Sequence, residues 1–407
     1  MSEKGTSSNA SLPLAGVRVI DFTHVISGPF CTMMLAHMGA DVVKVERPGV
    51  GDSLRNIPAY EGRDGHSDYF NSVNNTKRSV AFDLKDPAQH EAVINLIEAA
   101  DVVVENFKPG TAARIGLGYD ALKEINPKLI YCSISGFGQT GPYAQKPAID
   151  PIIQAVSGVM SVTGERDGPP MMSGYPLTDT VAGMYGAFAI STALLKARET
   201  GVGEHLDVSM QGAMLYVLGC RMAETLQADI VTERVGNQNP FRVPSDVFFS
   251  KDNRPTILHC SNDMRWKALC RALEKPEWAE NPKYDSMKKR QDHRDEIHAL
   301  VGERFAERDQ AEWMPRFEAE DTTCIHVHDY REALDHDQIA HREQLTKRDH
   351  ARDGEVWTVG APLMNASYNK AITAPPLLGE HTGDVLSDWL GWSADQIGAI
   401  LPGEEKE

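Results

Sequence analysis

The first third of the chain alternates short apolar segments with helix-length segments, and this alternation constrains the fold most strongly. Short apolar stretches bounded by turn residues predict buried strands. We expect strands over residues 17–22, 41–45, 101–105 and 129–134, and helices over residues 29–38, 87–100 and 120–125. Strands that alternate with helices are typical of βαβ units and of a mostly parallel sheet. The sequence therefore predicts an α/β fold with a Rossmann-like parallel-sheet domain.

The loops that follow these strands are the places to look for a binding site. In open α/β sheets, ligands bind beyond the carboxyl ends of the strands. These loops begin at Thr23, Arg47, Asn106 and Ser135. We expect functional side chains to gather there.

The length of the chain predicts more than one domain. It has 407 residues, whereas a single hydrophobic core stops growing at roughly 250–300 residues. After about residue 225 the segments become more polar and charged, with a charged helical run over residues 288–308, and apolar pieces return near residue 356. We expect a disordered tail (1–12), a large domain (13–200), a linker (201–230), a smaller α+β domain (231–330), and a return linker with a C-terminal segment that packs on the large domain (331–407).

The net charge limits the partners of this protein. A formal charge of -17 repels nucleic acid and anionic lipid at long range. It still allows an anionic small molecule, because a few clustered arginines and lysines can bind phosphate groups locally. We therefore expect a small-molecule ligand and neither a nucleic-acid nor a membrane partner.

The cysteines and the N-terminal residues favour the cytoplasm. The six cysteines form no CxxC pair, and residues 1–11 lack the layout of a signal peptide. Reduced thiols in a cytoplasmic protein fit this pattern. The most apolar stretch, residues 181–195, is short for a membrane span and rich in Gly and Ala, which favours a buried helix.

The motifs that could indicate a cofactor or a metal ion are incomplete in this sequence. A GxGxxG pattern occurs at residues 136–141, but Pro142 and Pro147 interrupt the helix that a dinucleotide site needs. His326 and His328 would lie on one face of a strand, yet no third ligand has convincing spacing. The chain also lacks a Walker loop and a nucleophile elbow. We expect no permanently bound cofactor and no metal.

Asp179 is the acid with the clearest chemical potential. It lies in GYPLTDTVAG (174–183), just before a long apolar segment over residues 181–199 that predicts a helix. Thr178 or Asp179 could simply be the N-cap of that helix. A helix N-terminus also stabilises a carboxylate, and an ionised carboxylate can act as a covalent nucleophile. The residues themselves leave both interpretations open.

A set of segments in a fixed order resembles one family, the class III CoA-transferases, which include formyl-CoA:oxalate and carnitine CoA-transferases. The resemblance runs from about Leu14 to the last predicted helix and is densest before about Met210. It is carried by LAGVRVIDF (14–22), GP (28–29), GADVVKVERP (39–48), NTKRS (75–79), ENFKPG (105–110), SGFG (135–138) and APPLLGEHT (374–382).

The resemblance implies a CoA site on the large domain. It implies that a CoA thioester is the substrate. The loop after the first strand would contact CoA, one arginine would bind near the adenosine, a second segment would contact the pantetheine or the adenine, and another arginine would bind a phosphate. In this sequence the corresponding residues are His24, Val25, Ile26, Ser27, Arg47, Asn106, Phe107, Arg114 and Ser135. Guanidinium groups suit the three phosphates of CoA.

The resemblance also implies the chemistry. The family's catalytic aspartate falls on Asp179, which would form an aspartyl anhydride with the donor acyl group and then an enzyme–CoA thioester. Gly136, Phe137 and Gly138 would offer backbone N–H groups to developing oxyanions. Family members form interlocked, ring-like dimers, so a homodimer is expected, and a heteromer with a paralogous subunit is the alternative.

Two departures bear on the reaction. Related racemases carry a histidine where this chain has Ile149, next to Asp150, and without it proton exchange lacks half of its acid–base pair. Oxalate-specific members carry a glycine run that residues 240–262 lack, and a polar residue where this chain has Ile26. A racemase-like isomerase and a non-catalytic CoA-binding subunit stay as alternatives.

No motif in the sequence indicates which carboxylic acids are the donor and the acceptor. The resemblance to the family implies succinyl-CoA as the donor and a dicarboxylic acid as the acceptor. Arg221, Arg234 and Arg242 are candidate partners for a second carboxylate, although a structural role is favoured for each.

Overall fold

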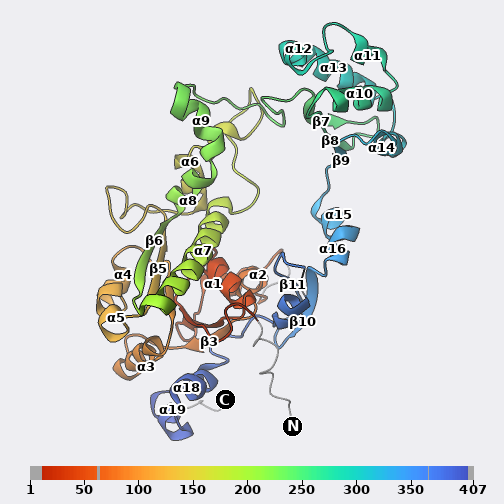
Figure 1. The fold of residues 1–407 in the computed structure, drawn as a ribbon. Coiled ribbons are helices and arrows are strands. Elements are labelled where there is room, and N and C mark those ends of the chain that lie inside the picture. The colour runs from red at the N-terminus through yellow and green to blue at the C-terminus, as the bar shows by residue number, and fades with distance from the viewer. Residues whose placement is uncertain (1–11, 62–64, 365, 402–407) are drawn as a thin grey trace. The chain divides into compact units, whose positions relative to one another are not determined.

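The computed structural model describes residues 12–61, 65–364 and 366–401. Apart from Leu12, the predicted N-terminal tail lies outside these residues. The chain forms two compact units (Figure 1). The first comprises Met1–Ser157, Ser173–Ala223 and Asp337–Glu407, and the second comprises Gly158–Met172 and Glu224–His336.

A six-stranded parallel sheet forms the centre of the first unit. Its strand order is β3-β2-β1-β4-β5-β6, and all neighbouring strands run parallel. The strands are β1 (Arg18–Asp21), β2 (Asp41–Glu46), β3 (Arg78–Ala81), β4 (Val102–Glu105), β5 (Ile130–Ser135) and β6 (Glu204–Ser209). The prediction of an α/β fold with a parallel sheet is confirmed.

Two strands escaped the sequence prediction because both lie at sheet edges. β3 has only four residues, and β6 has the half-polar sequence EHLDVS with His205 and Asp207 exposed. The pattern that predicts a buried parallel strand is a continuous apolar run. An edge strand that faces water in part lacks this run.

Helices cover both faces of the sheet. On one face, Ile20, Val43 and Val103 pack in a core with α3 (Pro87–Glu98), α5 (Tyr119–Ile125) and α18 (Thr382–Leu390). On the other face lie α1 (Ser27–His37) and α7 (Leu177–Thr200). A Cβ added to Gly186 would contact Cys31 of α1 and Ile134 of β5, so this glycine lets α7 approach both elements. Because helices cover both faces of the sheet, its central strands are apolar on both sides.

The helix α7 is, by length and composition, the one helix among the described residues that could cross a membrane. Ala182, Gly186 and Ile190 are buried in it, and it packs against α1, β5 and β6. This packing is typical of a core helix.

The remaining elements of the first unit surround this sheet. Its C-terminal segment pairs with β3, because the N–H of His381 donates to the carbonyl of Ser79 at 2.9 Å. These elements are η1 (Ser53–Asn56), α2 (Asp68–Asn74), α4 (Thr111–Arg114), α6 (Asp150–Val156), α8 (Met210–Val217), α16 (Asp337–His341), the antiparallel β10 (Leu345–His350) and β11 (Gly354–Val359), α17 (Ala366–Ala371) and α19 (Ala394–Ile400). The helix α9 (Gly219–Ala228) runs across the boundary between the units.

The second unit is a smaller α+β structure, as predicted. It has η2 (Val159–Val162), an antiparallel sheet of β7 (Ser245–Phe249), β8 (Pro255–His259) and β9 (Cys324–His326), and the helices α10 (Asp263–Ala272), α11 (Glu277–Glu280), α12 (Met287–Asp292), α13 (Arg294–Phe305), α14 (Gln310–Ala319) and α15 (Tyr330–Leu334). Trp266, Trp313 and Phe317 are fully buried in its core. The charged run predicted as one helix forms two, which meet at His293.

Candidate active site

Asp179 lies in the first turn of α7, where its side chain is half-buried. Four residues further on, a Cβ added to Gly183 would lie 2.6 Å from the carbonyl oxygen of Ser27. The two helices therefore approach closely at this point, and the first residue of α1 comes against the first turn of α7. The Ser27 side chain lies near the Asp179 carboxylate and lowers the pKa of that group.

The helix α7 is capped by a residue from another element. Its N-cap position is Pro176, and neither Thr178 nor Asp179 makes a side-chain cap there. Instead, the Asp150 carboxylate accepts the Thr178 N–H and the Thr178 hydroxyl, both at 2.7 Å, and the Asp179 N–H at 3.4 Å. The side-chain amide of Gln154 donates to its other oxygen at 2.6 Å. The interpretation of Thr178 or Asp179 as the cap is thus wrong, and the Asp179 carboxylate is left for other contacts.

The same arrangement sets the ionisation of Asp179. Burial, followed by the nearby charge of Asp150, raises the pKa of Asp179 from 3.8 to about 7, while the Ser27 side chain opposes the rise. Burial therefore opposes the stabilisation that the sequence argument expects from the helix end. The helix amides that would stabilise the anion are largely bonded to Asp150. A carboxylate with a pKa near the working pH is a better nucleophile when ionised than one with an ordinary pKa.

The loop that connects β1 to α1 carries four of the predicted CoA contacts. Val25 has a positive φ of 68° in this loop, and its N–H donates to the Asp52 carboxylate at 3.2 Å. The side chain of Asn106 accepts the N–H of His24 and donates to the carbonyl of His24, both at 2.8 Å. The ring of Phe107 lies 6.0 Å from the ring of His24. The structure therefore brings together His24, Val25, Ser27, Asn106 and Phe107, as predicted from two segments far apart in the sequence.

The guanidinium groups of the two predicted phosphate-binding arginines have N–H donors left for a ligand. Arg47 is exposed and makes no side-chain hydrogen bond or ion pair with the described residues. Arg114 is exposed as well and donates to the Thr111 hydroxyl at 3.0 Å. Ile26, in contrast, is half-buried and packs beside Leu54 and Phe70. Its apolar environment suits an isoleucine.

The loop after β5 has close backbone packing. Gly138 has a φ of +91°, and its N–H donates to the Ser135 hydroxyl at 3.1 Å. A Cβ on Gly136 would lie 2.0 Å from the Cβ of Ala148, two residues before Asp150. The ring of Phe137 contacts that of Tyr143. Gly136 is thus required for packing next to the Asp150 segment, and the Gly138 N–H already has a partner.

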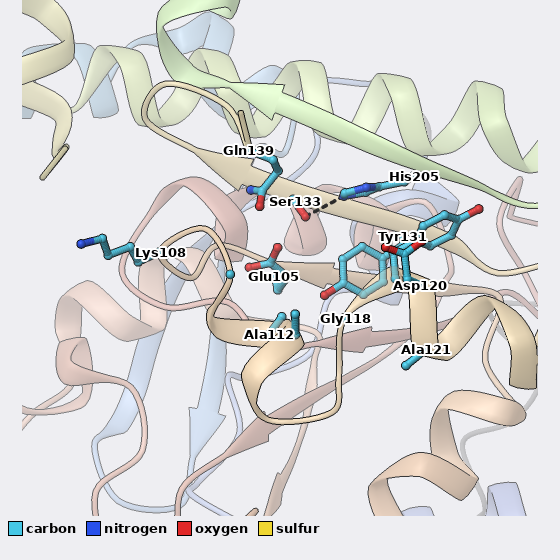
Figure 2. A pocket seen from close by; sticks show the side chains of 13 residues that line it. Glu105, Lys108, Ala112, Gly118, Asp120, Ala121, Tyr131, Ser133, Gln139 and His205 are labelled. Atoms are coloured by element: carbon cyan, nitrogen blue, oxygen red, sulfur yellow. Dashed lines mark hydrogen bonds between the residues drawn. The ribbon is translucent and has the colours of Figure 1, made fainter. Parts of the chain in front are cut away.

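A cavity of about 330 Å³ lies on the α5 side of the sheet, opposite to α1 and α7 (Figure 2). The side chains of Glu105, Ser133 and His205 come from three neighbouring strands and line it. The Ser133 hydroxyl and the His205 Nε2 are 2.9 Å apart, and burial raises the pKa of the neighbouring Glu105. Neither Asp179 nor a predicted CoA contact lines this cavity.

Other candidates from the sequence have structural partners. Arg234 donates to the carbonyls of Ser161, Glu165 and Gly168, which fixes that loop. Arg242 donates to the carbonyl of Phe241, and the backbone N–H of Arg221 donates to the carbonyl of Leu218 at 2.8 Å. His326 is held by Gln310 and Glu332. Within the part of the chain that the structure describes, no group of three or more His, Cys, Asp or Glu residues is suited to a metal ion.

Sequence reasoning missed two acids that bond to the backbone of the candidate site, Asp52 and Asp150. Asp150 was noticed only as the neighbour of Ile149, and its capping role depends on a contact 28 residues along the chain. Asp52 lies in a polar loop with no distinguishing pattern. Only the fold shows that both carboxylates accept backbone N–H groups next to predicted site residues.

Comparison with known proteins gives a consistent result. The family model described as CoA-transferase family III matches residues 14–382. The chain is 35% identical over 392 residues to the succinyl-CoA:glutarate CoA-transferase of Homo sapiens, covering 96% of this chain and 89% of that protein. It is 34% identical over 415 residues to the formyl-CoA:oxalate CoA-transferase of Escherichia coli O139:H28, with 96% and 98% covered. A CAIB/BAIF family protein from Brucella suis has a crystal structure that matches with a TM-score of 0.83 at 30% identity, over 93% of this chain and 99% of that one.

Proposed function

This chain belongs to CoA-transferase family III and is a CoA-transferase that acts between acyl-CoA thioesters and carboxylic acids, and from this premise we propose that Asp179 is its nucleophile. The observation that carries the proposal is the placement of the Asp179 carboxylate. It lies at the start of α7, close to Ser27 after β1, and its pKa is raised to about 7.

The proposed reaction runs through two covalent species on Asp179. The carboxylate attacks the thioester carbonyl, the C–S bond breaks, and CoA leaves as the thiolate while a mixed anhydride forms. The thiolate then attacks the aspartyl carbonyl, which releases the donor acid and leaves an enzyme–CoA thioester. An acceptor carboxylate reverses both steps and regenerates the Asp179 carboxylate. The covalent route through Asp179 divides one difficult acyl transfer into a series of easier steps.

We place CoA along the loops after β1, β2, β4 and β5. Arg47 and Arg114 would bind its phosphates, because both guanidinium groups are exposed and Arg47 has no partner among the described residues. Phe107 and His24 would contact the adenine or the pantetheine. The Gly136 and Phe137 N–H groups would serve a developing oxyanion, whereas the Gly138 N–H is bonded to Ser135.

For substrates, we propose succinyl-CoA as donor and a dicarboxylic acid as acceptor. The support is the likeness to the human succinyl-CoA:glutarate CoA-transferase, which is 35% identical over nearly the whole chain. Relatives that act on oxalate are of similar identity, so a substrate panel must include oxalate. Ile26, where oxalate-specific members carry a polar residue, weighs against oxalate.

We further propose a cytoplasmic homodimer of the interlocked kind. The support is an apolar face on α7 and α8, where Met184, Tyr185, Phe188, Tyr216 and Val217 are exposed. Such a face is typical of surfaces that bind another protein. The six free cysteines support the reducing compartment. Light scattering would give the mass of the assembly, and a monomer would contradict the dimer.

The nucleophile is tested by trapping. The enzyme is incubated with succinyl-CoA and treated with hydroxylamine or borohydride, and the modified residue is located by mass spectrometry. We expect the label on Asp179, with loss of both label and acyl exchange in Asp179→Asn. Asp384 occupies the same first-turn position in α18 and is exposed, so Asp384→Asn serves as the matched control. An active Asp179→Asn enzyme would contradict the proposal. Incorporation of deuterium at the α-carbon of the acyl-CoA in deuterium oxide, with no acceptor carboxylic acid required, would contradict it as well.

A further inference from the structure

The loop after β1 holds a residue in an unfavourable backbone conformation. Val25 has a φ of 68°, in the left-handed region. A β-branched residue is a genuine outlier there, and such conformations persist only where surrounding contacts impose them. The structure shows which contacts do so.

One side of this loop is held by a buried acid. Asp52 is fully buried and accepts the Val25 N–H with both oxygens, at 3.2 and 3.3 Å. The ammonium of Lys44, itself fully buried, lies 3.2 Å from the same carboxylate and also donates to the Thr23 carbonyl at 2.5 Å. The charge of Asp52 is therefore compensated, and its position is fixed from the sheet.

The other side is held by Asn106 at the end of β4. Its amide oxygen accepts the His24 N–H and its amide nitrogen donates to the His24 carbonyl, both at 2.8 Å, so the side chain pairs with His24 as a strand would. The same nitrogen lies 3.4 Å from the Ser27 hydroxyl. Both ends of the amide are thus used by the protein, and little hydrogen-bonding capacity is left for a ligand.

We propose that Asn106 and Asp52 are positioning residues, which together hold Val25 in the left-handed conformation so that Ser27, at the start of α1, lies against α7 beside Asp179. This inference rests on the proposed role of Asp179. It assigns Asn106 to the geometry of the nucleophile and removes its side chain from the direct contacts with CoA.

The test is a double-mutant cycle between Asn106 and Val25. Glycine adopts positive φ without the cost that valine has, so Val25→Gly reduces the need for a clamp. In the wild-type background, Asn106→Ala should lower kcat by about 100-fold, since misplacement of a reacting group by about 1 Å has effects of this size. In the Val25→Gly background, the same substitution should lower kcat by less than about tenfold. A direct CoA ligand would lose the same factor in both backgrounds.

Further measurements separate positioning from binding and from misfolding. The KM and the dissociation constant for CoA should change little in Asn106→Ala. The acid limb of kcat should move to higher pH, because Ser27 lowers the pKa of Asp179 and would be displaced. Asn126 similarly clamps the carbonyl of Ala100 at 2.7 Å, at the opposite end of β4. Asn126→Ala is therefore the matched control, and it should alter thermal stability without altering kcat.

Asn106→Asp covers the case in which Asn106→Ala fails to fold. The aspartate keeps an acceptor for the His24 N–H but loses both donors, so kcat should still fall. A loss confined to KM, or an equal loss of kcat in both Val25 backgrounds, would overturn the inference. Trapping at Asp179 in the wild-type enzyme reports separately on the nucleophile, so the two proposals can fail independently.

Discussion

Replacing Asp150 by asparagine should make the enzyme more active in mild acid. Asp150 carries the charge that, after burial, contributes most to the raised pKa of Asp179. Asparagine has the same shape, and its amide oxygen can still accept the Thr178 N–H and hydroxyl that Asp150 accepts at 2.7 Å. Asp150→Asn therefore removes the repulsion while keeping most of the cap, and the pKa of Asp179 should fall.

The size of the effect follows from the ionised fraction. With a pKa of about 7, Asp179 is about half ionised at pH 7 and about one-tenth ionised at pH 6. The ionised form is present above this pKa and is lost as the pH falls through it. When the pKa falls, kcat/KM should rise by up to about tenfold at pH 6 and about twofold at pH 7, with a loss well above pH 7, where both enzymes are ionised and the anion of lower pKa is the weaker nucleophile. The weaker cap should lower the free energy of unfolding by about 1 kcal/mol.

The assay is acyl exchange between succinyl-CoA and a labelled acid, followed from about pH 5 to about pH 9 so that both limbs of the profile are sampled. Asp86 caps α3 in the same way, by accepting the Ala88 and Gln89 N–H groups. Asp86→Asn should therefore reduce stability and leave the profile in place. If the acid limb of Asp150→Asn stays where it is or moves to higher pH, the charge of Asp150 does not control Asp179 and the argument is refuted.

Three further predictions concern the scaffold. Asp21→Asn leaves the fully buried Lys77, whose ammonium lies 3.0 Å from the Asp21 carboxylate, without its counter-ion and should lower the free energy of unfolding by about 3–5 kcal/mol in urea titrations; a loss below about 1 kcal/mol would contradict this account. Burial raises the pKa of Glu105, so stability should fall as the pH rises through that pKa; Glu105→Gln should raise the melting temperature more at about pH 8 than at about pH 5, and an equal change at both would refute the reasoning. Gly183→Ala places a Cβ 2.6 Å from the Ser27 carbonyl oxygen and should cost about 1–3 kcal/mol in calorimetry, with a fall in kcat if the helix contact positions Ser27; an unchanged enzyme would show that the helices can separate freely.

Much of the fold follows from local pattern. The valine-rich segments around Val19, Val43 and Val103 are buried on both faces, and this property is visible as continuous apolar runs. The start of α7 was misplaced by four residues, at Val181 instead of Leu177, because its first turn is polar and is capped by Asp150 from another helix. A cap that is distant in sequence leaves no local signal.

The sequence by itself determined the family, the parallel sheet, the loops that carry the site and the candidate nucleophile Asp179. Motif order and apolar periodicity are properties of the chain, so they survive without coordinates. Only the tertiary structure decided that Asp150 is the cap, that Ser27 lies near Asp179, and that Asp52 and Asn106 bond to the backbone around Val25. The reason is physical: pKa values and backbone strain depend on burial and on contacts a few ångströms long, and these join residues from 27 to 152 positions apart in the chain.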